Sequence, residues 1–122
     1  MANYVVWMDQ EHANIFELHP NEVKETHMKR HEIRQHTGAE KEQNRRKNTD
    51  KFFGDVAQHL TGAHEILLLG PGLAKEHFKS HLESHHQELL GKKIVGVETV
   101  DHPTDGQIVA LAKKFFKAHL SA

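Results

Sequence analysis

The chain has no cysteine, no long apolar run and no marked excess of charge of either sign. Without cysteine there is no disulfide framework, no thiolate nucleophile and no cysteine-based zinc site. Its apolar runs, such as Ile66–Leu69, are far shorter than the ~20 residues that a membrane helix needs, and no basic region followed by an apolar stretch opens the chain. We therefore expect a cytoplasmic protein with no membrane partner.

The length and charge of the chain suit one small globular domain, which we expect to span residues 1–122. Sixteen Lys and Arg against 17 Asp and Glu give a formal net charge of -1, so the whole molecule is not a polycation that coats nucleic acid. The charge is unevenly distributed, however. Residues 1–27 hold five acidic residues and one basic residue, whereas residues 28–49 hold seven basic and three acidic residues.

The segment of residues 28–49 contains only three apolar residues, too few to bury a core, and it is predicted to be a solvated basic loop. Its cations could contact phosphates through counterion release, and a flexible cationic loop suits structured RNA. We expect no DNA specificity. A merely solvated loop is the alternative. The candidate RNA-binding residues are Lys29, Arg30, Arg34, Lys41, Arg45, Arg46 and Lys47.

Apolar patterning predicts five strands and three helices. The strands are expected over residues 4–8, 14–18, 23–27, 65–69 and 94–100, the first three as an antiparallel meander. The helices are expected from a cap at Asn48 or Thr49 to Gly62, from the Gly70-Pro71-Gly72 turn to Gly91, and from a cap at Thr104 or Asp105 onward. Phe53 and Phe78 fall on inward-facing stripes. The order βββαβαβα predicts an α/β domain with a five-stranded mixed sheet and helices packed on it.

This order, with a polar loop between the third strand and the first helix, resembles the middle domain of the eukaryotic and archaeal peptide-chain release factors and of Pelota, including stand-alone bacterial relatives. The similarity is carried by the hairpin of Val5–Asp9 and Ala13–Glu17, the helix around Phe52 and Phe53, and the segment Ile66–Phe78. The resemblance implies a ribonuclease H-like fold, no cofactor, and the ribosome, rRNA or tRNA as partners.

In release factors the loop after the third strand bears a Gly-Gly-Gln tripeptide whose glutamine promotes hydrolysis of peptidyl-tRNA. The corresponding stretch here, residues 35–43, lacks that tripeptide and offers only Gln35, Gln43 and the single glycine Gly38. Pelota also lacks it and acts in ribosome rescue. The resemblance thus favours a translation-associated RNA-binding protein, and the alternatives are a minimal peptidyl-tRNA hydrolase using Gln35 or Gln43 and a protein-interaction module without RNA. The sequence leaves the oligomeric state open.

Two further groups of residues are candidate ligand sites. Gly70, Gly72 and Lys75 stand where a strand runs into a helix, so backbone N–H groups and an ammonium group could hold an anion there. The alternative is a tight turn that needs glycine for its backbone angles. His77, His81 and His85 recur at one-turn spacing on a helix and could chelate a metal ion, or simply form a solvated face of a chain with 13 histidines.

Overall fold

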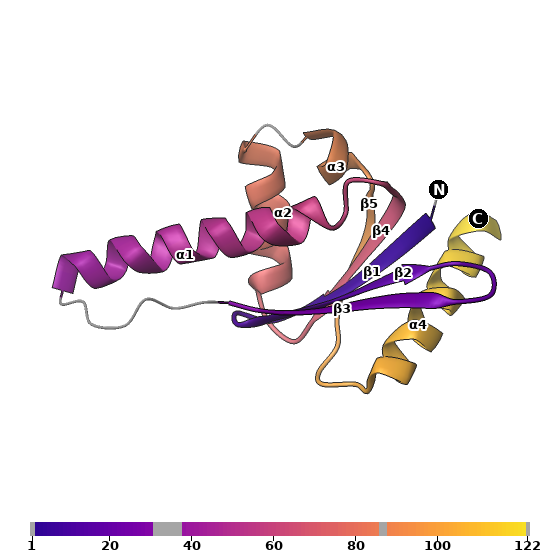
Figure 1. Ribbon diagram of the computed structural model, residues 1–122. Coiled ribbons are helices and arrows are strands. Elements are labelled where there is room, and N and C mark those ends of the chain that lie inside the picture. The colour runs from indigo at the N-terminus through magenta and orange to yellow at the C-terminus, as the bar shows by residue number, and fades with distance from the viewer. Residues whose placement is uncertain (1, 31–37, 86–87, 122) are drawn as a thin grey trace.

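The computed structural model describes residues 2–30, 38–85 and 88–121, which form five strands and four helices (Figure 1). The strands are β1 (Ala2–Met8), β2 (His12–Leu18), β3 (Val23–Lys29), β4 (Ala63–Gly70) and β5 (Ile94–Thr99). The helices are α1 (Gly38–Gln58), α2 (Ala74–Ser84), α3 (Glu88–Lys92) and α4 (Asp105–Ser121). None of the described helices is long and apolar enough to cross a membrane.

The strands form one mixed sheet in the order β3-β2-β1-β4-β5. β2 is antiparallel to both β1 and β3, whereas β4 is parallel to β1 and β5 is parallel to β4. The predicted meander and the five-stranded mixed sheet are confirmed. β1 and β4 lie at the centre with both faces covered, which explains why their sequences are almost continuously apolar rather than alternating.

Helices cover both faces of the sheet: α1, α2 and α3 lie on one face and α4 on the other (Figure 1). On the first face the rings of Phe53 and Phe78 meet edge to face, with 5.4 Å between their centroids. Both side chains are buried, as predicted. On the second face α4 contributes the buried residues Ile108, Ala112 and Phe116.

The start of α4 is fixed by a capping box, in which two residues satisfy each other's backbone N–H groups. The N–H of Gln107 donates to Oγ1 of Thr104 at 3.2 Å, and the N–H of Thr104 donates to Oε1 of Gln107 at 2.9 Å. The cap predicted at Thr104 is therefore confirmed.

The first helix begins at Gly38, well before the predicted cap at Asn48 or Thr49. Residues 38–49 are poor in apolar side chains but rich in Ala, Glu, Lys, Gln and Arg, which are strong helix formers. Apolar spacing missed them because Phe52 is the first buried apolar residue among the α1 side chains that the structure describes. The prediction of a basic loop is wrong for residues 38–49, which are helical, and for residues 28–29, which end β3. Residues 31–37 lie outside the described residues.

The second predicted helix is divided into α2 and α3. The backbone of His85 leaves the helical conformation, with φ of -112° and ψ of 34°, and Oγ of Ser84 donates to the carbonyl of Ser80 at 2.9 Å. Such hydroxyl bonds compete with the helical backbone pattern. Gly91, the predicted stop, lies inside α3. The element order is therefore βββαβααβα.

Candidate nucleic-acid interface

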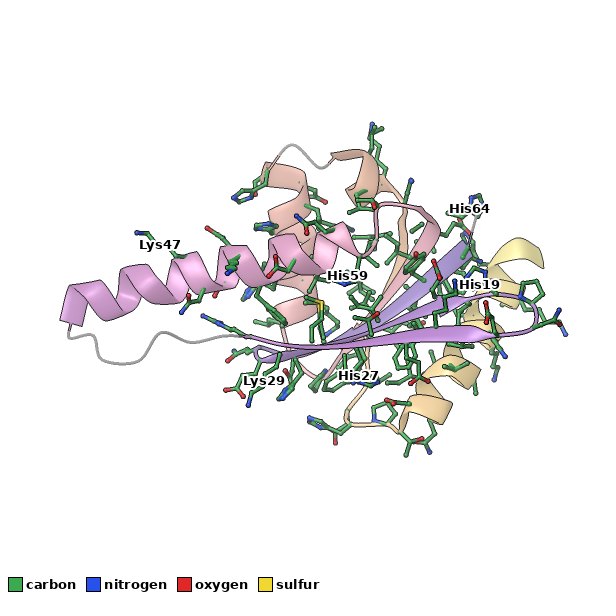
Figure 2. All side chains as sticks on the ribbon, viewed as in Figure 1. His19, His27, Lys29, Lys47, His59 and His64 are labelled. Atoms are coloured by element: carbon green, nitrogen blue, oxygen red, sulfur yellow. The ribbon has the colours of Figure 1, made fainter. Side chains whose placement is uncertain are left out.

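A groove lies between α1 and the edge strand β3, the two elements to which most of the described part of the basic segment, residues 28–49, belongs. Within that groove lies a cavity of about 410 Å³, lined by His27, Met28, Lys29, Asn48, Lys51, Phe52 and Asp55. Phe52 and Met28 form the apolar part of the lining, whereas Lys29 and Lys51 are exposed at its surface. Figure 2 shows Lys29 at the end of β3 and Lys47 on the outer surface of α1.

The lining of this groove carries groups that suit a nucleic-acid strand. The ammonium groups of Lys29 and Lys51 can contact phosphate oxygens, and the amide of Asn48 can donate to and accept from bases or 2′-hydroxyls. Asp55 is the acidic residue of the lining, and its negative charge partly offsets the positive charge of the two lysines. The spacing of residues 48, 51, 52 and 55 places them on one face of α1. That spacing could have revealed Asn48 and Lys51, which sequence reasoning did not assign to the interface.

The predicted RNA-binding residues fall into four groups. Lys29 and Lys47 are exposed, on β3 and α1 respectively. Arg30 is half-buried; its backbone N–H donates to the carbonyl of Glu11 at 2.7 Å, and it borders a smaller cavity of about 240 Å³. Helix α1 contains Lys41, Arg45 and Arg46, and also Gln43. Arg34 and Gln35 lie outside the described residues.

The N-terminal half of α1 runs beyond the edge of the sheet (Figure 1). Residues 41–47 in this half include four basic residues and one acidic residue. At a rise of 1.5 Å per residue they occupy roughly 10 Å of helix. Because the helix already orders the backbone of these residues, binding a polyanion costs the protein less conformational entropy than ordering a loop would.

Close packing requires glycine at Gly70, at the start of the strand-to-helix turn, whereas a Cβ at Gly72 would meet no atom within 4 Å. A Cβ atom at Gly70 would lie 2.1 Å from the carbonyl oxygen of Met8, on the neighbouring strand β1. Only glycine allows that approach. The side chain of Lys75 is buried, and its Nζ donates to the carbonyl of Gly72. The lysine therefore holds the turn itself.

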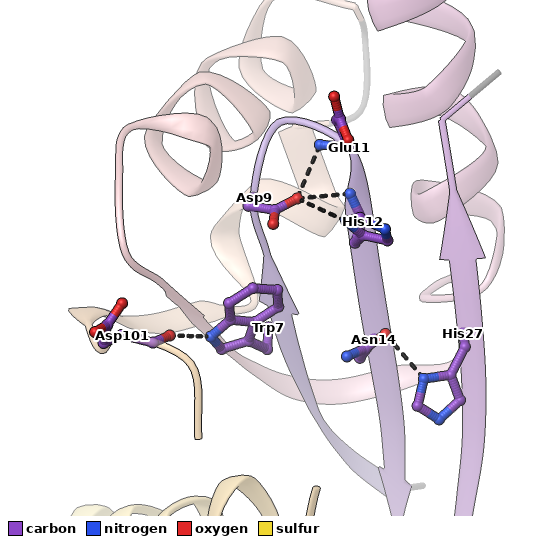
Figure 3. Close-up of polar contacts among 7 residues, drawn as sticks. All are labelled: Trp7, Asp9, Glu11, His12, Asn14, His27 and Asp101. Carbon is purple, nitrogen blue, oxygen red and sulfur yellow. Dashed lines mark hydrogen bonds and ion pairs between the residues drawn. The ribbon is translucent and has the colours of Figure 1, made fainter. Parts of the chain in front are cut away.

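A second cavity of about 410 Å³ lies beside this turn, lined by Asp9, Gln10, Glu11, Pro71, Gly72, Leu73, Ala74 and His102. Figure 3 shows Oδ1 of Asp9 accepting the backbone N–H groups of Glu11 at 2.8 Å and His12 at 2.7 Å. It also shows the indole N–H of Trp7 donating to the carbonyl of Asp101 at 2.9 Å, which ties β1 to the segment before α4. The two carboxylates in the lining oppose an anion. Anion binding by Gly70, Gly72 and Lys75 stays a prediction, and the negative charges of Asp9 and Glu11 disfavour it.

The three histidines predicted as metal ligands are not grouped together. The rings of His81 and His85 stack with centroids 4.0 Å apart, beside Asp50 of α1, whereas His77 borders the smaller cavity next to Arg30. Burial, and after it the neighbouring His85, lowers the pKa of His81, while Asp50 opposes the shift. The lowered pKa favours the neutral imidazole of His81.

Several solved structures share this fold, although no protein-family model and no curated protein matches the chain. Pelota from Archaeoglobus fulgidus is similar with a TM-score of 0.63 and 20% identity, covering 93% of this chain. Pelota from Thermoplasma acidophilum has a TM-score of 0.60 and 18% identity, covering 87%. An archaeal translation termination factor, aRF1, has a TM-score of 0.58 and 17% identity, covering 98%. The chain has the fold of one part of these proteins.

The predicted resemblance in fold to the release-factor and Pelota proteins is thereby confirmed. The match covers nearly all of this chain but only 31% of the first Pelota structure, 30% of the second and 41% of aRF1. The chain therefore spans about a third of the length of these relatives, and what the whole proteins do is a separate question from the shared fold.

Proposed function

We propose that this protein is a translation-associated RNA-binding protein that contacts the ribosome, through rRNA or tRNA, in ribosome rescue or in the response to stalling. The observation that carries the proposal is the projecting basic half of α1 beside a groove that displays Lys29 and Lys51. The likeness in fold to an archaeal translation termination factor supports the translational context. No cofactor and no DNA specificity is part of the proposal.

The charge distribution of the described residues supports contact through this side of the molecule. Lys47 and Lys51 are exposed on α1, and Lys29 is exposed across the groove on β3. Arg45 and Lys41 precede Asn48 by one and two helical turns in the backbone of α1. A phosphate chain that follows the helix toward the groove would therefore pass the exposed Lys47 before it reaches Lys51 and Lys29, and each phosphate contact releases a counterion.

The proposal is tested by sedimenting the protein with ribosomes through a sucrose cushion at low and at high salt. We expect the protein to pellet with ribosomes at roughly 50 mM salt and to remain in the supernatant at roughly 500 mM, because phosphate contacts weaken steeply with salt. Failure to pellet at low salt would contradict the proposal. Pelleting that is insensitive to salt would instead favour a protein-interaction module.

We also expect the purified protein to release little or no peptide from peptidyl-tRNA, with or without ribosomes. Gly38, Ala39 and Gln43 lie in a helix. This stretch also lacks the flexible glycine pair that would turn a glutamine into a reaction centre. Small displacements of a positioning group can lower rates about 100-fold. Peptide release is measured with labelled peptidyl-tRNA. If the protein does release peptide, and Gln35→Ala or Gln43→Ala abolishes the release while RNA binding is retained, the proposal is wrong and the protein is a hydrolase.

A further inference from the structure

Asp50, His81 and His85 form a compact cluster between α1 and α2. One carboxylate oxygen and one ring nitrogen from each histidine all lie within 4.8 Å of one another. His81 lies in the last turn of α2, His85 follows directly after the last residue of that helix, and the aspartate comes from α1. We propose that these three side chains bind a divalent transition-metal ion of the zinc class.

The imidazole of His81 is the centre of the cluster. Its side chain is only 8% exposed, packed edge to face against Phe53 at 5.4 Å and stacked on His85. Its Nδ1 faces Oδ1 of Asp50 at 3.7 Å, which is too long for a hydrogen bond. Among the described residues neither ring nitrogen of His81 has a hydrogen-bond partner, so both stay available as ligand atoms.

The imidazole of His85 is held in the tautomer that a ligand needs. Its Nδ1 lies 3.0 Å from the carbonyl oxygen of His81. Because a carbonyl only accepts, Nδ1 carries the hydrogen, and Nε2 keeps its lone pair. Metal-bound histidines are commonly oriented by such a bond from the other ring nitrogen. Asp50, whose side chain is 60% exposed, leaves the cluster open to solvent and so to an entering ion.

The spacing and the donor types select the class of metal. Zinc bonds of 2.0–2.1 Å in a tetrahedron place neighbouring ligand atoms about 3.4 Å apart, a few tenths of an ångström less than the separation between His81 and Asp50. Two imidazoles and one carboxylate favour zinc and similar ions over magnesium or calcium, which prefer oxygen ligands. Three protein ligands leave the fourth position to water. The bound ion would join α1 to α2 next to the basic half of α1.

The test is calorimetric titration of the full chain with Zn²⁺, in parallel with the double variant Asp50→Asn, His85→Gln. Both replaced side chains are exposed, so the fold should survive, whereas His81 is left in place because it is part of the packed interior. We expect the native chain to bind one Zn²⁺ at this cluster more tightly than at any other site. In the double variant the affinity of this site for Zn²⁺ should fall about tenfold or more. Zn²⁺ should also raise the Tm of the native chain and not that of the variant.

A matched control is needed because the chain has 13 histidines. Glu25, His27 and Asp105 form a second cluster within 4.8 Å, but His27 is 51% exposed and its Nδ1 is bonded to Oδ1 of Asn14 at 2.9 Å (Figure 3). The variant His27→Gln should keep the tight Zn²⁺ site. The proposal is overturned if the double variant binds Zn²⁺ as tightly as the native chain, or if His27→Gln weakens binding equally. It is likewise overturned if the native chain binds no Zn²⁺ below millimolar concentrations.

Discussion

Replacing Phe78 by alanine should lower the free energy of unfolding by ~3–5 kcal/mol, because a large ring is removed from a packed interior. Phe78 is fully buried and contacts the ring of Phe53, so its loss opens a cavity between α2, α1 and the sheet. Urea titration followed by circular dichroism measures the change. Phe53→Ala, on the other side of the same ring contact, should have an effect of similar size.

The control for this prediction is Leu73→Ala. Leu73 is 63% exposed and immediately precedes α2, so its truncation should change the free energy of unfolding by less than about 0.5 kcal/mol. A Phe78→Ala variant within ~1 kcal/mol of the native chain would show that the interface between α2 and the sheet is not packed as described.

The order of the elements could be predicted from the sequence because the residues that define it are apolar and periodic. Local sequence signals predicted the strand at Ile66–Leu69, the inward-facing positions of Phe53 and Phe78, and the cap at Thr104. The structure has all three. What failed was the reading of polar segments. The start of α1 carries no apolar stripe, so only its helix propensity marks it. The break after Ser84 coincides with a bond from its hydroxyl to the carbonyl of Ser80, which the apolar pattern does not show.

The candidate sites were harder to predict because they join residues that are distant in the sequence. The groove pairs Lys29 of β3 with Lys51 of α1. Spacing along α1 groups Lys51 with Phe52 on one face, but nothing local indicates that this face lies across from the edge strand. The metal cluster replaces His77, which has the right spacing, with Asp50, which belongs to another helix. The burial of Lys75 could not be predicted from the sequence either, because a lysine is usually exposed, whereas this ammonium group donates to the carbonyl of Gly72.

Replacing Arg45, Arg46 and Lys47 together by alanine should weaken RNA binding strongly while leaving the fold intact. These residues precede Phe52, the first buried side chain among those that the structure describes in α1, and Lys47 is exposed. Each phosphate contact contributes about -0.7 to -0.9 to the slope of log K against log salt, so three contacts account for roughly two to three units and roughly 100-fold in affinity at 0.1 M salt. A matched control removes three cations from the opposite layer: Lys113, Lys114 and Lys117 of α4.

The central claim, that the basic segment is the RNA-contacting surface, is tested most directly by the salt dependence of binding to a structured RNA. The native chain, the Arg45, Arg46, Lys47 variant and the Lys113, Lys114, Lys117 variant are titrated at several salt concentrations. We expect the slope of the first variant to be shallower by about two to three units and that of the second to change by less than about one. An unchanged slope in the first variant, or an equal loss in both, would contradict contact through the basic segment.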